Sequence, residues 1–166
     1  MPLERLNTSK HDRGSFCCGN PSLDEYLKKR AQQDLKRSLA VPYVLCEDGS
    51  SIIGFYTLSA VSIDVGALPS DIAKQLPRYP SIPATLIGRL GVDERSQGQS
   101  FGKRLLFDAL YRSYKQADTI AAAAVVVDVK NENARAFYGR YDFLTLPDHP
   151  ERMFLEMKMI GKMFGL

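Results

Sequence analysis

A glycine-rich turn between two regular segments constrains the fold of this 166-residue chain more than any other feature. Residues 84–93 alternate between a more apolar and a more polar face, which predicts a strand. The run from Arg95 to Gly102 is rich in glycine and serine, and apolar residues then recur at helical spacing to about Gln116. A strand that leads through such a turn into a helix is typical of α/β folds, in which helices pack on a sheet.

The remaining pattern predicts further strands and helices without an internal repeat or a linker. Before the turn we expect a helix over 21–35, a β-hairpin of strands 41–46 and 52–63, and an ordered loop over 66–83 with a short helix at 70–75. After it we expect a buried strand over 121–127, a helix over 133–141 and a terminal strand that includes Met153, Leu155, Met157 and Met159. The chain is therefore interpreted as one domain, 1–166, of mixed α/β class around one sheet.

Composition excludes several classes of protein. With 45% hydrophobic and 25% charged residues, the chain is neither collagenous nor disordered, and a net charge of +3 does not by itself identify a nucleic-acid binder. Cys17, Cys18 and Cys46 lack the spacing of a disulfide framework or a zinc site, which favours a reducing, cytoplasmic setting. We also expect no signal peptide and no membrane span, because no apolar run approaches about 20 residues.

The chemistry of the turn suggests a phosphate site. Consecutive backbone N–H groups at a strand-to-helix junction converge on one point, and the helix N-terminus adds positive partial charge. The alternative is that Gly98 and Gly102 only permit a tight turn and close packing of the helix on the sheet. Two familiar phosphate motifs are absent, namely the G-x-x-x-x-G-K-S/T loop and a dinucleotide fingerprint after a first strand.

Two motifs in this order resemble the GNAT N-acetyltransferases. The run Arg95-x-x-Gly98-x-Ser100 is similar to their acetyl-CoA signature, Q/R-x-x-G-x-G/A, and the segment from Asn133 to Phe143 resembles their later N-x-A-x-x-F-Y…G-F helix. The resemblance implies a mixed sheet of about six or seven strands flanked by helices. It also implies that acetyl-CoA binds in a cleft where the fourth and fifth strands splay apart.

The same resemblance implies roles for individual residues. Tyr138 matches the tyrosine that serves as general acid for the leaving thiolate, and no general base is evident, since Asp93, Glu94 and Asp128 are expected to cap or pair locally. A backbone N–H on the strand before the turn is the expected oxyanion donor. The residues expected to bind acetyl-CoA are Leu90, Gly91, Val92, Gln97, Gly98, Gln99, Ser100, Phe101, Gly102, Lys103, Asn133 and Phe137, and no metal site is expected.

Three further segments, at 16–27, 54–60 and 79–93, resemble one branch of the family, the toxin-type acetyltransferases of bacterial toxin–antitoxin pairs (the TacT and AtaT group). Membership would imply that the acceptor is the amino group of aminoacyl-tRNA, and that a ribbon-helix-helix antitoxin neutralises the enzyme. A homodimer is also expected, with the apolar residues 153–155 and 159–166 as a candidate interface. The candidate residues for tRNA are Lys28, Lys29, Arg30, Lys36, Arg78 and Arg89, although the cations at 28–37 are also consistent with an ordinary solvated face.

Two other functions remain open at this point. The acceptor is a small-molecule amine or a peptide N-terminus in the first of them. In the second, the chain is a regulatory module that binds CoA without turnover, an interpretation motivated by Ser100 and Asp142, which stand where the family pattern has Gly or Ala and Gly, respectively.

Overall fold

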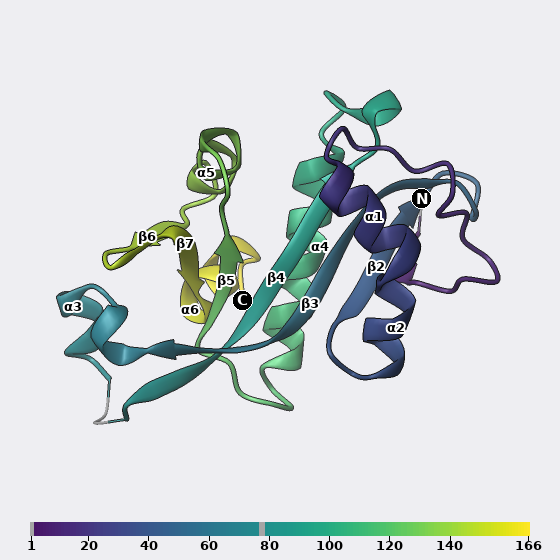
Figure 1. Ribbon diagram of the computed structural model, residues 1–166. Coiled ribbons are helices and arrows are strands. Elements are labelled where there is room, and N and C mark those ends of the chain that lie inside the picture. Colours follow the sequence, from purple (N-terminus) through teal and green to yellow (C-terminus); the bar gives the residue numbers. More distant parts are fainter. Residues whose placement is uncertain (1, 77–78) are drawn as a thin grey trace. The chain divides into compact units, whose positions relative to one another are not determined.

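The computed structural model describes residues 2–76 and 79–166, and its elements alternate between strands and helices (Figure 1). The first part of the chain forms β1 (Leu3–Arg5), α1 (Pro21–Lys29), α2 (Ala31–Lys36), β2 (Val41–Cys46), β3 (Ile52–Asp64), the 3₁₀ turn η1 (Val65–Ala67) and α3 (Ser70–Ala73). The second part forms β4 (Ser81–Val92), the 3₁₀ turn η2 (Glu94–Ser96), α4 (Phe101–Gln116), β5 (Ala124–Asp128), α5 (Glu132–Gly139), β6 (Leu144–Leu146), β7 (His149–Glu156) and α6 (Met157–Met163).

The seven strands form one sheet in the order β1-β2-β3-β4-β5-β7-β6, which confirms the expected mixed α/β class and the strand number. The pairs β1–β2, β2–β3, β5–β7 and β6–β7 are antiparallel. The chain also separates into two compact units. Unit 1 comprises residues up to Ser59 together with Ile87–Ala109, and unit 2 comprises Ala60–Leu86 together with Leu110–Leu166.

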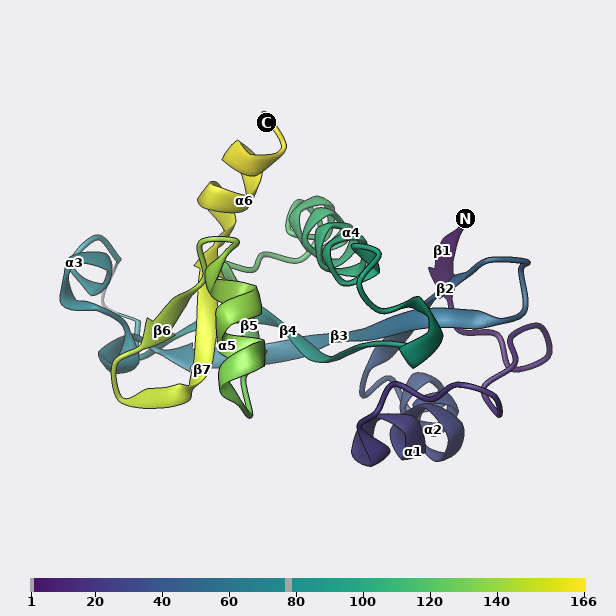
Figure 2. The ribbon, with the colours of Figure 1, turned by 90° about the horizontal axis from the view of Figure 1, so that it is seen from above.

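Unit 1 has helices on both faces of its strands. Figure 2 shows α1 and α2 on one face of β2 and β3, and the first turns of α4 on the other face. A buried aromatic pair, Phe16 and Phe55, packs edge to face at 5.5 Å in the core beneath α1. The core cluster comprises Leu6, Phe16, Tyr26, Leu27, Ala31, Val44, Cys46, Ile52 and Phe55.

The helix expected over 21–35 is two helices that meet at Arg30. The first begins as the sequence indicates, because the side chain of Asn20 accepts the N–H groups of Ser22 and Leu23 and Pro21 occupies the first turn. Its end has a physical cause that the periodicity does not contain. The guanidinium of Arg13 donates to the carbonyl oxygens of Leu27 and Lys28 at 3.2 and 3.0 Å, so these oxygens are satisfied from outside the helix.

Unit 2 contains β5, β6, β7 and the later helices. Its core cluster comprises Ile63, Leu68, Ile82, Ala84, Ala124, Val126, Leu146 and Phe154. The predicted strand at 121–127 is β5, which begins only at Ala124. The short strand β6 was not predicted, and β4 begins at Ser81, inside the stretch expected to be a loop.

The expected terminal strand is wrong beyond Glu156, because Met157 and Met159 lie on helix α6. The alternation of methionines with polar residues is a strand pattern, and tertiary packing overrides it beyond Glu156. Gly161 permits the docking of α6, since a Cβ at this position would lie 2.9 Å from the ring of Tyr114 on α4. No helix within residues 2–76 and 79–166 is long and apolar enough to span a membrane.

A second close approach, at Gly54 in unit 1, gives a stability prediction. A Cβ at Gly54 would lie 2.7 Å from Cδ1 of Leu105 and 2.9 Å from the backbone oxygen of Gly91. We expect Gly54→Ala to lower the free energy of unfolding by about 2–3 kcal/mol, measured by urea denaturation, because the backbone oxygen cannot yield without moving β4. Gly66→Ala is the matched control, since nothing lies within 4 Å of its added methyl group. Equal stability of the two variants would contradict the prediction.

Candidate functional site

The turn that follows β4 is anchored by Asp93, a buried carboxylate at the end of that strand. Its oxygens accept the backbone N–H groups of Cys17 at 3.1 Å and Arg95 at 2.9 Å. They also accept hydrogen bonds from Nε and Nη2 of the Arg95 side chain, at 2.8 and 3.1 Å. The hydrogen bonds from the Arg95 side chain are the main reason that the pKa of Asp93 falls to about 2. Asp93 is therefore a structural anion, and it does not have the free, elevated pKa of a general base.

Beyond this anchor the backbone adopts a conformation that leaves a row of amides open. Gly98 and Ser100 both have positive φ, +80° and +64°, and α4 begins at Phe101. In the part of the chain that the structure describes, the N–H groups from Gly98 to Lys103 have no backbone acceptor, and the first amide to donate is that of Arg104, to Ser100. Six successive open amides at a helix N-terminus are the donor set that binds phosphate.

The side chains of the turn differ in what they contact. The amide nitrogen of Gln97 donates to the carbonyl oxygens of Cys18 at 3.0 Å and Val92 at 2.9 Å. Arg95, the first residue of the recognised motif, is engaged by Asp93. The ammonium of Lys103 lies 5.5 Å from the ring centre of Phe107. Gln99 and Ser100 are exposed to solvent.

The end of β4 carries the three residues expected to supply an oxyanion donor, Leu90, Gly91 and Val92. Gly91 is buried, and a side chain there would contact Leu23 at 3.4 Å and Cys18 at 3.6 Å. The loop that contains Cys18 therefore packs directly on this part of the strand. These distances are ordinary van der Waals contacts, so the Cys18 loop and Leu23 cover the end of β4 at Gly91 without crowding it.

The second group of predicted residues lies in unit 2, on α5. This helix begins where the side chain of Asn131 accepts the N–H of Ala134 at 2.8 Å. Asn133 is exposed, whereas Tyr138 is buried, with only 7% of its surface exposed. The centre of its ring lies 5.1 Å from that of Phe137 and 5.3 Å from that of Phe143. Burial raises the pKa of Tyr138, which keeps its hydroxyl protonated at neutral pH as a proton donor requires.

The two departures from the family pattern keep the backbone geometry of glycine. Ser100 has φ +64° and Asp142, just before Phe143, has φ +69°. Each position is thus left-handed, which costs a residue with a Cβ roughly 1–2 kcal/mol relative to glycine. Neither substitution removes the turn that the pattern requires.

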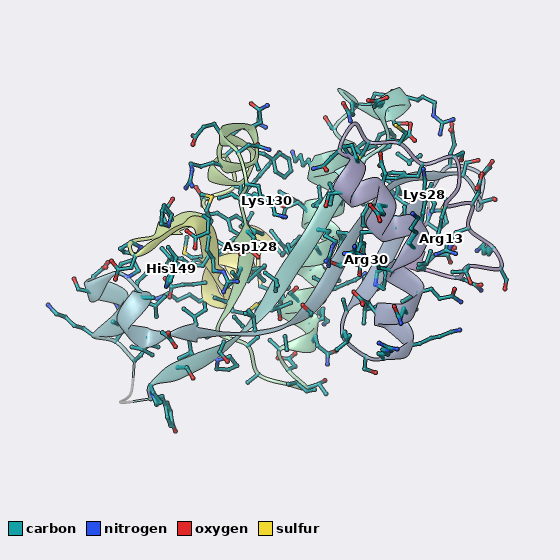
Figure 3. The ribbon with its side chains drawn as sticks, viewed as in Figure 1. Arg13, Lys28, Arg30, Asp128, Lys130 and His149 are labelled. Carbon is teal, nitrogen blue, oxygen red and sulfur yellow. The ribbon has the colours of Figure 1, made fainter. Side chains whose placement is uncertain are left out.

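Unit 2 also contains a cavity of about 480 Å³ that the sequence analysis did not find. Asp128, Lys130 and His149 are among its lining residues and are labelled in Figure 3. Nε of Arg152 contacts Asp128 at 2.9 Å, whereas buried Val129 and Leu146 contribute apolar surface. Asp128 ends the buried strand β5, which the sequence indicates, but the residues that β7 contributes to the cavity depend on its pairing with β5, which the sequence does not show.

The basic residues predicted to bind the acceptor lie mainly on α1 and α2. Residues 28–37 include five basic residues and one acidic residue, and Lys28, Lys29, Arg30 and Lys36 are exposed (Figure 3 labels Lys28 and Arg30). The carboxylates of Asp24 and Asp34 bind the Cys18 N–H and the Tyr26 hydroxyl, each at 2.9 Å. These acids are thus engaged in local contacts.

The other two candidates in this set are Arg89 and Arg78. The guanidinium of Arg89 lies 3.6 Å from the centre of the Tyr26 ring, which fixes it over the aromatic face through a cation–π contact. Arg78 lies outside the described residues. Lys29 contacts Glu25 at 3.9 Å on the exposed surface of α1.

The strand, the open-amide turn and the tyrosine-bearing helix are features of an acetyltransferase. The chain belongs to the acetyltransferase (GNAT) family, whose model matches residues 12–143. It is 37% identical to a protein of Sinorhizobium fredii named probable toxin TacT, over 98% of this chain and 94% of the relative. It is 36% identical to a tRNA-acetylating toxin of Mycobacterium tuberculosis, over 93% of this chain and 91% of the relative.

A solved structure supports the same assignment at the level of the fold. The structure described as AtaT complexed with acetyl-methionyl-tRNAfMet superposes with a TM-score of 0.91 at 27% identity, and covers 98% of each chain. No group of three or more His, Cys, Asp or Glu residues suited to a metal ion is found among residues 2–76 and 79–166.

The Asp93 anchor leads to a prediction about pH. Because folding lowers the pKa of Asp93, its stabilising contribution is fully present above about pH 4 and is lost as the pH falls through about 2. We expect Asp93→Asn to lower the free energy of unfolding by about 1–2 kcal/mol at pH 7 and to reduce the loss of stability between about pH 4 and pH 2. Urea denaturation across this range measures both effects. An unchanged acid dependence in the variant would contradict the assignment.

Proposed function

We propose that the chain is an acetyl-CoA-dependent N-acetyltransferase that acetylates the amino group of aminoacyl-tRNA and thereby blocks translation. The observation that carries this proposal is the row of open amides from Gly98 to Lys103 in a chain 36% identical to a tRNA-acetylating toxin. The amides fit the pyrophosphate of acetyl-CoA, because they are unpaired donors at the start of a helix of 16 residues.

Acetyl-CoA supplies an activated thioester, from which the acceptor nitrogen takes the acetyl group as an amide while the sulfur leaves as a thiolate. The residues of this chain have two tasks. A backbone N–H of Leu90, Gly91 or Val92 stabilises negative charge on the acetyl oxygen. Tyr138 gives the proton of its hydroxyl to the thiolate and then regains a proton from solvent. Asn133 and Phe137, on α5, are further candidate residues for binding acetyl-CoA.

The acceptor amine needs no dedicated base in this proposal. Asp93 is held as an anion by Arg95, and Asp128 is paired with Arg152 at 2.9 Å. The ammonium group of an aminoacyl ester is acidic enough to give its proton to water, which leaves the neutral amine that attacks the thioester. Water also takes the second proton that the nitrogen releases as the amide forms. The basic residues Lys28, Lys29, Arg30, Lys36, Arg78 and Arg89 would bind the tRNA backbone, because phosphate neutralisation supplies most of the affinity for a nucleic acid.

The same proposal includes a cellular setting and partners. Because aminoacyl-tRNA is used in translation, we expect the enzyme to act in the cytoplasm. Resemblance to toxins of toxin–antitoxin pairs supports neutralisation by a ribbon-helix-helix antitoxin. Met153, Phe154 and Leu155, expected at a homodimer interface, are instead buried in the interior of unit 2, because they lie on the paired strand β7. The partly exposed residues of 159–166 remain the candidate surface for a homodimer.

Transfer of labelled acetyl groups from acetyl-CoA to bulk charged tRNA tests the reaction. We expect transfer by the natural sequence and a fall of about 100-fold or more in kcat for Tyr138→Phe, because the thiolate then leaves without a proton donor. Affinity for CoA is expected to stay within about twofold, since the ring of residue 138 is retained. Label found only on small amines or peptides would assign the alternative acceptor class. CoA binding with no transfer to any acceptor would favour a regulatory module.

Charge reversal on α1 tests the tRNA surface separately. We expect Lys28→Glu combined with Arg30→Glu to raise KM for charged tRNA about tenfold or more and to leave KM for acetyl-CoA unchanged. The dependence of KM on salt should also become weaker, because fewer counterions are released on binding. Lys115→Glu, at an exposed position near the end of α4, is the matched control. An identical KM in the double variant and the control would exclude this surface.

A further inference from the structure

The segment Cys17–Asn20, here named the strap, belongs to the motif at 16–27 that the proposed chemistry does not use. It connects the turn after β4 with the first turn of α1, and all of its contacts lie within unit 1. Its amides and carbonyls contact both elements, so its conformation depends on each of them. The contacts are specific enough to assign a role.

On the side of the turn, three backbone groups of the strap are engaged. The N–H of Cys17 donates to Asp93 at 3.1 Å, and the oxygen of Cys17 accepts the N–H of Glu94 at 2.8 Å. The oxygen of Cys18 accepts the side-chain amide of Gln97 at 3.0 Å. Because that amide also donates to Val92 at 2.9 Å, Gln97 joins the strap, the end of β4 and the start of the open-amide row.

On the side of α1, two side chains hold the strap. Asp24 accepts the N–H of Cys18 at 2.9 Å, and Asn20 caps the helix through the N–H groups of Ser22 and Leu23. The strap passes Glu94 closely, since a Cβ at Gly19 would lie 3.0 Å from a carboxylate oxygen of that residue. Gly19 also has φ +89°, so a larger residue would be strained there as well as crowded.

We propose that the strap and Gln97 position the open-amide turn for acetyl-CoA, and that Gln97 acts through its side-chain contacts with the protein. The identity of the ligand rests on the proposed function. Gln97 is thus a positioning residue, because both hydrogens that its amide can donate have acceptors in the protein. The strap fixes the direction in which the amides from Gly98 onward point. The turn residues alone would define this direction less well, because two of them adopt positive φ values.

Isothermal titration with CoA itself tests this role in the full chain. Gln97→Met keeps the length of the side chain and removes both donors. We expect the Kd for CoA to rise about five- to tenfold, while the thermal midpoint of unfolding stays within a few degrees. Gln116→Met, at an exposed position at the end of α4, is the matched control and should bind CoA as the natural sequence does.

The other end of the strap provides an independent variant with a rescue. Asp24→Ala removes the acceptor for Cys18 and is expected to weaken CoA binding several-fold. Asp24→Asn retains an acceptor oxygen and should restore most of that affinity. In steady-state kinetics the affected variants should raise KM for acetyl-CoA and leave kcat within about twofold, because the groups that carry the chemistry are untouched.

Two results would overturn the inference. One is an unchanged Kd for CoA in Gln97→Met. The other is a weaker Kd accompanied by a large fall in the unfolding midpoint, which would show that Gln97 serves stability alone. The proposed function fails separately, through absence of acetyl transfer to charged tRNA, and the CoA titration remains informative in that case.

Discussion

The buried carboxylate of Asp93 is the interaction on which the rest of the site depends. It ends β4, accepts the backbone N–H groups of Cys17 and Arg95, and pairs with the Arg95 guanidinium. A buried anion is tolerated only when such donors surround it, so its position fixes the positions of its partners. The open amides begin a few residues further along the chain. Asp93 thus helps to fix the start of the turn whose open amides we propose to bind phosphate.

The left-handed residues Ser100 and Asp142 bear on whether the chain is a working enzyme. They stand where the family pattern has Gly or Ala and Gly, respectively, a difference that would suit a regulatory module without turnover. Both keep positive φ, and Tyr138 retains its place on α5. The backbone required for the site is therefore present, at a cost of roughly 1–2 kcal/mol at each of the two positions. The family assignment and the tRNA-acetylating relative support an active enzyme.

Local signals predicted the strand, turn and helix around Gly98 and the helix of Tyr138, because glycines and regular apolar spacing are properties of neighbouring residues. Features that depend on distant partners were not predicted. Arg13 donates to carbonyl oxygens in the last turn of α1, and Gly161 on α6 lies against Tyr114 on α4. The pairing of Asp93 with Arg95, two residues further on, is by contrast local, as the sequence predicted. The motif predicted that Gln97 belongs to the site, but its contact with Cys18 joins positions far apart in the sequence.

We propose that the amides from Gly98 to Lys103 bind the pyrophosphate of acetyl-CoA and that Tyr138 protonates its sulfur as it leaves. A crystal structure with CoA bound tests this most directly. We expect phosphate oxygens within hydrogen-bonding distance, about 2.7–3.2 Å, of these backbone nitrogens, with the Tyr138 hydroxyl directed at the CoA sulfur. Phosphates bound away from residues 97–103, or a sulfur remote from Tyr138, would contradict it.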